Sequence, residues 1–491
     1  MGWRNAMTKR VIGMVALGCG LIGLLFWAPS CAVNPVSGKQ ELMLLSETEE
    51  IKLGHETDVQ IIKQYGIYED PKVTAYLNNL CQRLARISHR PNLAYRFKIL
   101  DASVVNAFAV PGGYVYFTRG ILATVNSEAE LAGLIGHEIG HITARHSAKQ
   151  YSKAQLAQLG LGVGSIFIDS QILSGLAQVG VGMLFMRFSR DNEREADSLG
   201  IEYSSKLGYD ATQMASFFET LERMNPGSDR SGLPGWFSTH PSPENRVQIV
   251  RERAKEVQQK LHQKDLILNR DIYLKQIDGL IFGDDPRHGY VEENVFYHPD
   301  KRIQFPVPAK WKLHNNSSQV QMVSEGQEAA ILFNESPFSS SKEAASIFTT
   351  QYKAHVIRSD AIKVNGLSSE RVISDIQTQQ KVLRVMSYFI EKDQQVFIFN
   401  GVSPSGIYSR YETIFDYSMR QFKELSDPKK INVKPDRIRI YATRAPDTLG
   451  NNLLSFSVSN EKLKEMALLN GGDLNQVIPA NTLIKVVEKG R

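Results

Sequence analysis

The chain has few cysteines and little excess charge. Its three cysteines are Cys19, Cys31 and Cys81, so we expect neither a disulfide framework nor a cysteine-based zinc site. Cys81 lies in an apolar helical pattern and is expected to be buried. The 57 basic and 52 acidic residues give a net charge of +5 over 491 residues, which is too weak a bias to indicate nucleic-acid binding. This length predicts about three domains, and the 42% apolar share is enough to build their cores.

Long apolar runs without charge are also scarce, and the first lies at the N-terminus. Residues 11–27 form such a run behind a short basic segment, a pattern typical of a signal peptide, which we place at residues 1–30. Cys31 follows small residues, which resembles a bacterial lipobox and predicts that Cys31 is acylated and becomes the mature N-terminus. An ordinary cleaved signal and an uncleaved anchor are the alternatives.

The strongest functional motif is HEIGH, which runs from His137 to His141. Residues four apart share a helix face, so both imidazoles can bind one metal ion. Glu138 lies beside them and can take a proton from water activated by the metal. A capping box of Ser127 and Glu130, followed by apolar residues at helical spacing, predicts the helix. The alternative is a chance motif made of core or surface histidines.

A second acidic motif supplies candidate partners for the histidines. Residues 189–197 read SRDNEREAD and open another predicted helix. Glu193 and Asp197 are four apart and share a face, whereas Glu195 points roughly 200° away from Glu193. A glutamate ligand with an aspartate beside it fits a zinc site. The alternative is a solvated, charged start of a helix.

These motifs resemble the gluzincin metallopeptidases of the HtpX and CAAX-prenyl-protease group. NAFAVPGG and STHPSPENR extend the likeness, which covers roughly residues 35–260, and the chain is most similar to the soluble periplasmic, BepA-like branch. The resemblance implies one Zn²⁺ per chain, bound by His137, His141 and Glu193. It makes Glu138 the general base and lets Asp197 orient a zinc-bound histidine.

A short sheet is predicted just before the HEIGH helix. Residues 95–100 and 106–110 read as strands, and a Pro-Gly-Gly turn leads into a third strand. A strand beside a metal helix is a suitable place for an extended peptide to pair by its backbone, and an ordinary sheet is the alternative. The resemblance assigns substrate pairing to Asn106, Ala107, Phe108, Ala109 and Val110.

Two more candidate residues lie in the STHPSPENR loop. The resemblance brings this loop to the cleft, where His240 or Arg246 would act as a catalytic residue that stabilises the oxyanion of the tetrahedral intermediate. His240 is also placed to take the open position of the zinc and hold the enzyme latent. The alternatives are that His240 is a plain loop residue and that Arg246 pairs with a helix acid.

Residues 151–188 form the second long apolar run. Asp169 is the only charged residue between Lys153 and Arg187, but the Gly, Gln and Ser content argues against two membrane spans. We expect an apolar helical segment that covers or flanks the cleft.

The predicted fold class is α+β with several domains. A mainly helical zincin-type domain with a small edge-stranded sheet covers residues 31–265, and a helical linker covers residues 266–289. Residues 290–427 alternate as strands around one helix and weakly resemble PsbP-like accessory domains. Residues 431–491 read as strand-helix-helix-strand and resemble LysM-type modules, although the usual Gly-Asp-Thr-Leu is Pro-Asp-Thr-Leu here.

The predicted function is a zinc metalloendopeptidase on the periplasmic side of the bacterial cell envelope, tied to the membrane by a lipid anchor. Its partners would be polypeptide substrates, with peptidoglycan or envelope assembly proteins bound through the C-terminal domains, and no nucleic acid. Two rival functions remain open. One is a zinc amidase acting on peptidoglycan, and the other is a chaperone or assembly factor whose zinc site is latent.

Overall fold

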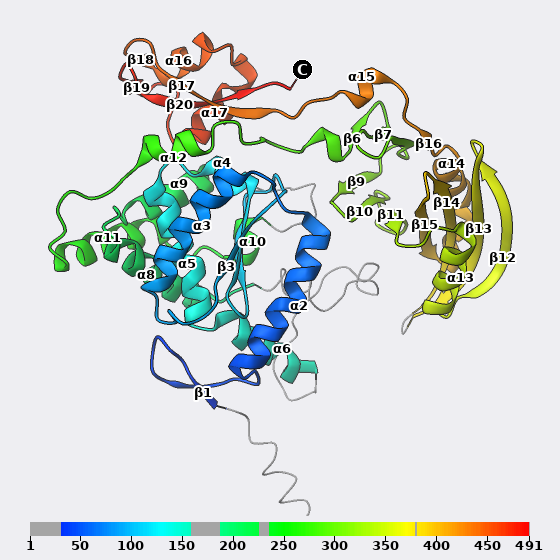
Figure 1. The fold of residues 1–491 in the computed structure, drawn as a ribbon, viewed down its shortest axis with the longest axis horizontal. Coiled ribbons are helices and arrows are strands. Elements are labelled where there is room, and N and C mark those ends of the chain that lie inside the picture. The colour runs from blue at the N-terminus through cyan, green and yellow to red at the C-terminus, as the bar shows by residue number, and fades with distance from the viewer. Residues whose placement is uncertain (1–30, 159–186, 225–234, 379–380, 491) are drawn as a thin grey trace, which may run out of the picture.

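The computed structural model describes residues 31–158, 187–224, 235–378 and 381–490. The predicted signal peptide and residues 159–186 of the predicted apolar cover lie outside the described residues. No helix in the described ranges is long and apolar enough to cross a membrane. A mainly helical N-terminal region, a strand-rich region to its right and a small C-terminal region above it make up the molecule (Figure 1).

Local signals explain where the helices of the N-terminal region begin. Ser46 forms a complete capping box with Glu49. At the HEIGH helix, Ser127 accepts a bond from the Glu130 N–H, but the Glu130 carboxylate reaches one residue further back and accepts from the Asn126 N–H. Only half of the predicted capping box therefore forms. The helices are α2 (Glu47–Tyr65), α3 (Pro71–Arg86), α4 (Arg119–Thr124), α5 (Glu128–Thr143), α6 (His146–Gln158), α8 (Arg190–Lys206), α9 (Gln213–Met224), α10 (Trp236–Thr239), α11 (Arg246–Lys260) and α12 (Arg270–Gln276).

Helix α5 lies at the centre of this region and packs against α8. All of its residues are buried, so the predicted apolar stripe is present, but no face of the helix is exposed to solvent. Glycines permit the close approach of the two helices, because a Cβ added to Gly136 would lie only 3.0 Å from the Gly200 Cα. This contact brings the first turns of α8 beside the HEIGH segment.

Three strands precede α5, in the order β3 (Arg96–Leu100), β5 (Tyr114–Thr118) and β4 (Ala107–Val110). β3 runs parallel and β4 antiparallel to β5, so β4 lies at an edge of the described sheet. Gly112 and Gly113 make the turn between β4 and β5 with φ of 78° and 92°, a region that favours glycine. The Thr118 N–H donates to the Asn106 carbonyl, and strand alternation then turns the backbone groups of Ala107 and Ala109 away from β5.

The strand-rich region follows, with a seven-stranded antiparallel sheet and a four-stranded sheet. The one helix predicted within residues 290–427 is present as α13 (Ser341–Gln351), and α14 (Glu412–Arg420) is a second helix that was not predicted. Aromatic and aliphatic side chains from both sheets share one core that includes Phe305, Phe333 and Phe399. The larger sheet runs β12 (His355–Val364), β13 (Leu367–Gln377), β14 (Val382–Lys392), β15 (Gln395–Pro404), β11 (Ala330–Ser336), β10 (Gln319–Val323) and β9 (Lys312–Asn315), and the smaller β16 (Lys423–Glu424), β8 (Ile303–Pro306), β7 (Val295–His298) and β6 (Tyr290–Glu292).

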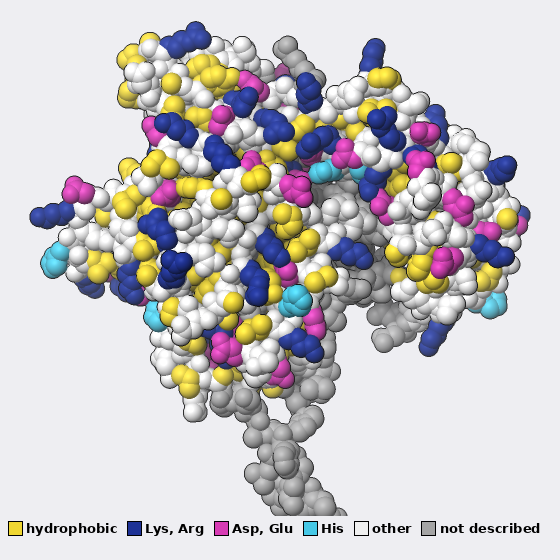
Figure 2. Space-filling view, in the orientation of Figure 1, with side chains coloured by type: hydrophobic (Ala, Val, Ile, Leu, Met, Phe, Trp, Pro, Cys, Tyr) yellow, Lys and Arg dark blue, Asp and Glu magenta, His cyan; other side chains and the backbone are white. Residues whose placement is uncertain are grey.

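The C-terminal region has the predicted order of strand, two helices and strand. β17 (Arg437–Ala442) pairs antiparallel with β20 (Leu483–Glu488), with α16 (Leu449–Ser455) and α17 (Leu463–Leu469) between them. Its buried apolar residues belong to the same apolar core as α5, and so do the buried apolar residues between positions 273 and 281 of the predicted linker. The small region sits directly on the N-terminal region in space-filling view (Figure 2). The resemblance to LysM modules stays a prediction.

Candidate metal centre

The structure brings His137, His141, Glu193 and His240 together. Their potential ligand atoms all lie within 4.8 Å of one another, and all four side chains are fully buried. Helix α5 contributes the two histidines, the first turn of α8 contributes Glu193, and His240 directly follows α10. The capping box of Ser189 with Asn192 begins α8 and so fixes the position of Glu193.

The spacing of these atoms fits a tetrahedral zinc site. His137 Nε2 lies 3.0 Å from His141 Nε2 and 3.3 Å from His240 Nδ1. Glu193 oxygens lie 3.6 Å from His137 Nε2, 3.5 Å from His141 Nε2 and 3.1 Å from His240 Nδ1. Tetrahedral ligands about 2.0–2.1 Å from zinc would be roughly 3.3–3.4 Å apart. The residues present therefore suit zinc in number, chemistry and spacing.

Glu138 lies next to this cluster and is not part of it. Its side chain is fully buried, and neither carboxylate oxygen has a hydrogen-bond partner among the described residues. The nearest charged partner is His240, whose Nε2 lies 3.7 Å from Glu138 Oε1. Burial raises the pKa of the Glu138 carboxyl. This carboxylate is free to engage a molecule that enters the site.

Asp197 and Arg246 contact two residues of the cluster, His137 and Glu193. Asp197 Oδ1 lies 2.9 Å from His137 Nδ1, the ring nitrogen that faces away from the cluster. Arg246 donates to both Asp197 oxygens at 2.7 and 2.9 Å and to Glu193 Oε2 at 3.0 Å. Burial alone would raise the pKa of Asp197, but the Arg246 guanidinium lowers it. Arg246 thus pairs with the acids of α8, the alternative to an oxyanion role.

His240 is held by aromatic neighbours. Its ring stacks on Trp236 with centroids 4.2 Å apart, and Phe188 lies 5.5 Å away. Phe188 also stacks on His141 at 4.0 Å, and its N–H donates to the Thr239 carbonyl. Burial would lower the pKa of His240, but the carboxylates of Glu193 and Glu138 raise it. Phe188 ends the predicted apolar cover, so this end of it does lie at the site.

The predicted substrate strand is present as β4, one residue shorter than expected. Its residues Ala107, Phe108, Ala109 and Val110 are at most 5% exposed. The Ser147 hydroxyl donates to the outward-facing Ala109 carbonyl at 3.1 Å. The edge is therefore covered in this conformation.

Sequence reasoning missed two residues at the site, Trp236 and His146, set Glu195 aside and placed Phe188 there only as the end of the apolar segment. Trp236, Phe188 and His146 contact the cluster histidines, and Glu195 contacts His146. The signal for His146 was its place at the end of the HEIGHITARH stretch, but helical periodicity does not put it near His141. Cys31 begins β1 (Cys31–Val33), and Cys81 is buried as expected.

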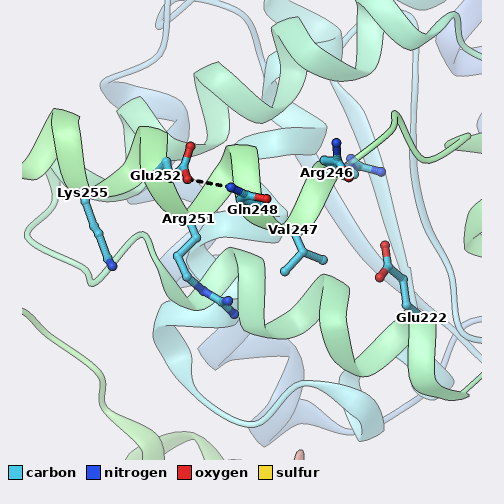
Figure 3. Close-up of a pocket in the computed structure, with 8 residues that line it drawn as sticks. Glu222, Arg246, Val247, Gln248, Arg251, Glu252 and Lys255 are labelled. Atoms are coloured by element: carbon cyan, nitrogen blue, oxygen red, sulfur yellow. Dashed lines mark hydrogen bonds between the residues drawn. The ribbon is translucent and has the colours of Figure 1, made fainter.

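A separate pocket of about 590 Å³ lies between α9 and α11. Figure 3 shows side chains of both signs around it, including Glu222, Arg251 and Lys255. Arg246 lines this pocket as well as the metal cluster, so the pocket adjoins the back of the site.

Comparisons with known proteins agree with this geometry. Residues 71–254 match the model of Peptidase family M48. The beta-barrel assembly-enhancing protease of Escherichia coli strain K12 is 29% identical over 260 residues, which are 50% of this chain and 52% of that protein. A protein of Vibrio cholerae is 32% identical over 199 residues, 39% of this chain and 41% of its own length. Mitochondrial metalloendopeptidase OMA1 of Schizosaccharomyces pombe is 28% identical over 237 residues, 47% of this chain and 68% of that protein.

The chain spans about half the length of the two bacterial relatives. The matched residues 71–254 include HEIGH, Glu193, Asp197 and His240. Over this domain the chain is similar to Peptidase family M48.

Proposed function

We propose that this chain is a zinc metalloendopeptidase of the cell envelope that binds one zinc ion through His137, His141 and Glu193. The observation that carries the proposal is the buried convergence of these donors beside Glu138, a carboxylate that has no hydrogen-bond partner among the residues that the structure describes. Two imidazoles and one carboxylate are a ligand set that zinc accepts.

The residues divide the chemistry between them. When bound, zinc would lower the pKa of water and polarise a peptide carbonyl. Glu138 accepts the proton of the attacking water and passes it to the leaving amine. Asp197 keeps His137 oriented, and Arg246 holds Asp197 and Glu193 in place.

The substrate would pair as an extended peptide along residues 106–110. Ala107 and Ala109 direct backbone groups outward, which is what an added strand needs. The peptide would replace the Ser147 hydroxyl at the Ala109 carbonyl. Because β4 is buried at rest, the segment around Ser147 must move before a peptide can pair with β4.

Metal content and peptide cleavage test this proposal together. His141→Ala and Glu193→Ala should lose both zinc and activity, whereas Glu195→Ala should keep zinc at saturating metal. Metal analysis of the purified variants decides the ligand set. An empty site in Glu195→Ala with a full site in Glu193→Ala would overturn the assignment.

His240 is proposed to hold the enzyme latent. Its Nδ1 lies among the ligand atoms and its ring is buried between Trp236 and Phe188. A histidine in this position would exclude water and substrate from the metal. The covered β4 edge supports the same resting state.

A peptidase assay on His240→Ala separates latency from catalysis. Latency predicts faster proteolysis, including self-cleavage, with zinc retained. An oxyanion role predicts a loss of roughly a hundred- to a thousandfold in turnover. A fall in rate with metal retained would refute latency, and an unchanged rate would make His240 a plain loop residue.

The natural substrates are proposed to be misfolded or unassembled envelope proteins. The Escherichia coli relative is named for beta-barrel assembly, and a strand that reads the peptide backbone accepts many sequences. Trapping with Glu138→Gln, followed by mass spectrometry of bound proteins, would identify them. Cleavage of purified sacculi instead would favour the peptidoglycan amidase.

A further inference from the structure

The His141 ring is held at both of its nitrogens. Its Nε2 faces the ligand cluster, 3.0 Å from His137 Nε2. Its Nδ1 lies 3.0 Å from Nδ1 of His146, a fully buried histidine. On its other side, His146 places Nε2 3.1 Å from Oε2 of Glu195. The two histidines and the carboxylate form one continuous hydrogen-bonded chain.

A break in the helix makes this chain possible. Residues five apart on an uninterrupted helix point about 140° away from each other, so His146 would not meet His141. Helix α5 ends at Thr143, and Arg145 adopts a left-handed conformation with φ of 56°. Arg145 is fixed there by bonds to Glu50 Oε2 at 2.9 Å and to the Leu45 carbonyl at 3.0 Å. The backbone then turns back and places the His146 ring against His141.

The direction of each hydrogen bond follows from the metal site. An imidazole that binds metal through Nε2 carries its proton on Nδ1. The His141 Nδ1–H must then donate to His146 Nδ1, which places the proton of a neutral His146 on Nε2. That Nε2–H points at the Glu195 carboxylate, an acceptor whose side chain is 31% exposed. Every donor in the chain thus meets an acceptor.

We propose that His146 and Glu195 are positioning residues for the metal ligand His141. They fix its tautomer and ring orientation and raise its basicity, as Asp197 does for His137 from Oδ1 at 2.9 Å. All three acids of the EREAD motif then act at the metal centre. Glu193 is a ligand, Asp197 contacts the ligand His137 directly, and Glu195 contacts the ligand His141 through His146. The inference rests on the proposed zinc site.

Zinc affinity and a cobalt spectrum test the chain on the full-length protein. His146→Leu removes the acceptor at similar volume, His146→Asn keeps an oxygen near the Nδ1 position, and Glu195→Ala removes only the outer carboxylate. Asp191→Ala is the matched control, because Asp191 lies on the same helix with its side chain 89% exposed and pairs with Arg194. Zinc dissociation constants come from competition with a fluorescent chelator, and the visible spectrum of bound Co²⁺ reports the ligand geometry.

His146→Leu should weaken zinc binding about 10- to 100-fold, the range for such outer partners. Glu195→Ala should weaken it less, His146→Asn should recover part of the loss, and Asp191→Ala should match the wild type. The Co²⁺ bands should shift in His146→Leu while the unfolding temperature of the zinc-free protein stays close to that of the control. If His146→Leu does not fold, Glu195→Ala still tests the chain from its exposed end.

Three different outcomes would overturn the inference. Wild-type zinc affinity and an unchanged Co²⁺ spectrum in both His146→Leu and Glu195→Ala would refute the positioning chain and leave the metalloendopeptidase intact. A wild-type protein that binds no zinc would refute both. A loss of stability that is equal with and without metal would assign His146 a purely structural role.

Discussion

Replacing Arg246 with Met would show whether this arginine supports the metal site or the transition state. Its side chain is 1% exposed and makes three hydrogen bonds to Asp197 and Glu193, which are themselves buried. Removing one partner of such a buried network leaves uncompensated charge and costs about 3–5 kcal/mol. At about 2–4 °C per kcal/mol for a domain of this size, unfolding should begin roughly 6–20 °C earlier. The loss should be larger with a chelator present, because zinc offsets part of the Glu193 charge.

Thermal unfolding with zinc and with chelator measures both effects. Arg251→Met is the matched control on the same helix, because Arg251 is 39% exposed and pairs with Glu219 at the surface at 2.8 Å, a contact worth at most about 1 kcal/mol. Equal shifts for the two variants would refute the support role. Unchanged stability and zinc affinity with turnover reduced would instead return Arg246 to the oxyanion.

Three further changes test the general base, the packing of α5 on α8 and the lipid anchor. Glu138→Gln keeps the shape of the side chain and removes its proton transfer, so zinc content should be unchanged and peptide cleavage should fall about 10²- to 10⁴-fold; retained cleavage would contradict the general-base role. Gly136→Ala places a Cβ 3.0 Å from Gly200, which should force α5 and α8 apart and cost about 1–3 kcal/mol by overpacking, as denaturant unfolding would show. Cys31→Ala should alter processing and release the protein from the membrane fraction; an intact mass with free Cys31 would argue against the lipid anchor.

Short-range patterns predicted the two helices of the metal cluster and which of their residues share a face. Capping residues and apolar spacing act within a few residues, so α5 and α8 begin where expected. His137 and His141 are four apart on one helix, and so are Glu193 and Asp197 on the other. Their meeting in space depends on the packing of α5 on α8, which the family resemblance supplied and periodicity did not.

The contacts that were not predicted depend on residues far apart in the sequence or on backbone that leaves the regular helical conformation. His146 reaches His141 only because a non-glycine residue, Arg145, takes a left-handed conformation that two tertiary bonds hold. Helical periodicity directed Glu195 away from the cluster, and it does lie outside, but its partner His146 could not be foreseen. Trp236 precedes a recognised loop by two residues, and nothing local shows that its ring stacks on His240.

Contacts between residues far apart in the sequence were also not predicted for the C-terminal region. Its sequence pattern predicts an independent module, but it shares the core around α5. Lys485 on β20 is fully buried and donates to the carbonyls of Ala123, Thr124 and Val125 at 2.7, 3.3 and 2.9 Å. These carbonyls end helix α4, where helical partners are missing and a cation is favoured. A residue some 360 positions away thus caps the helix that leads into α5.

Lys485→Met should therefore destabilise the N-terminal region as well as the C-terminal one. The change leaves three buried carbonyls without their hydrogen-bond donor, for an expected loss of about 3–5 kcal/mol in the free energy of unfolding. Lys489→Met is the control, because Lys489 is 74% exposed and pairs with Asp436 at the surface, so its loss should stay below about 1 kcal/mol. Denaturant unfolding followed by limited proteolysis measures both variants. If the two lost equal stability, or if Lys485→Met loosened only the C-terminal region, the bonds from Lys485 would contribute little to α5, and the C-terminal region would behave as the separate module that its sequence pattern predicts.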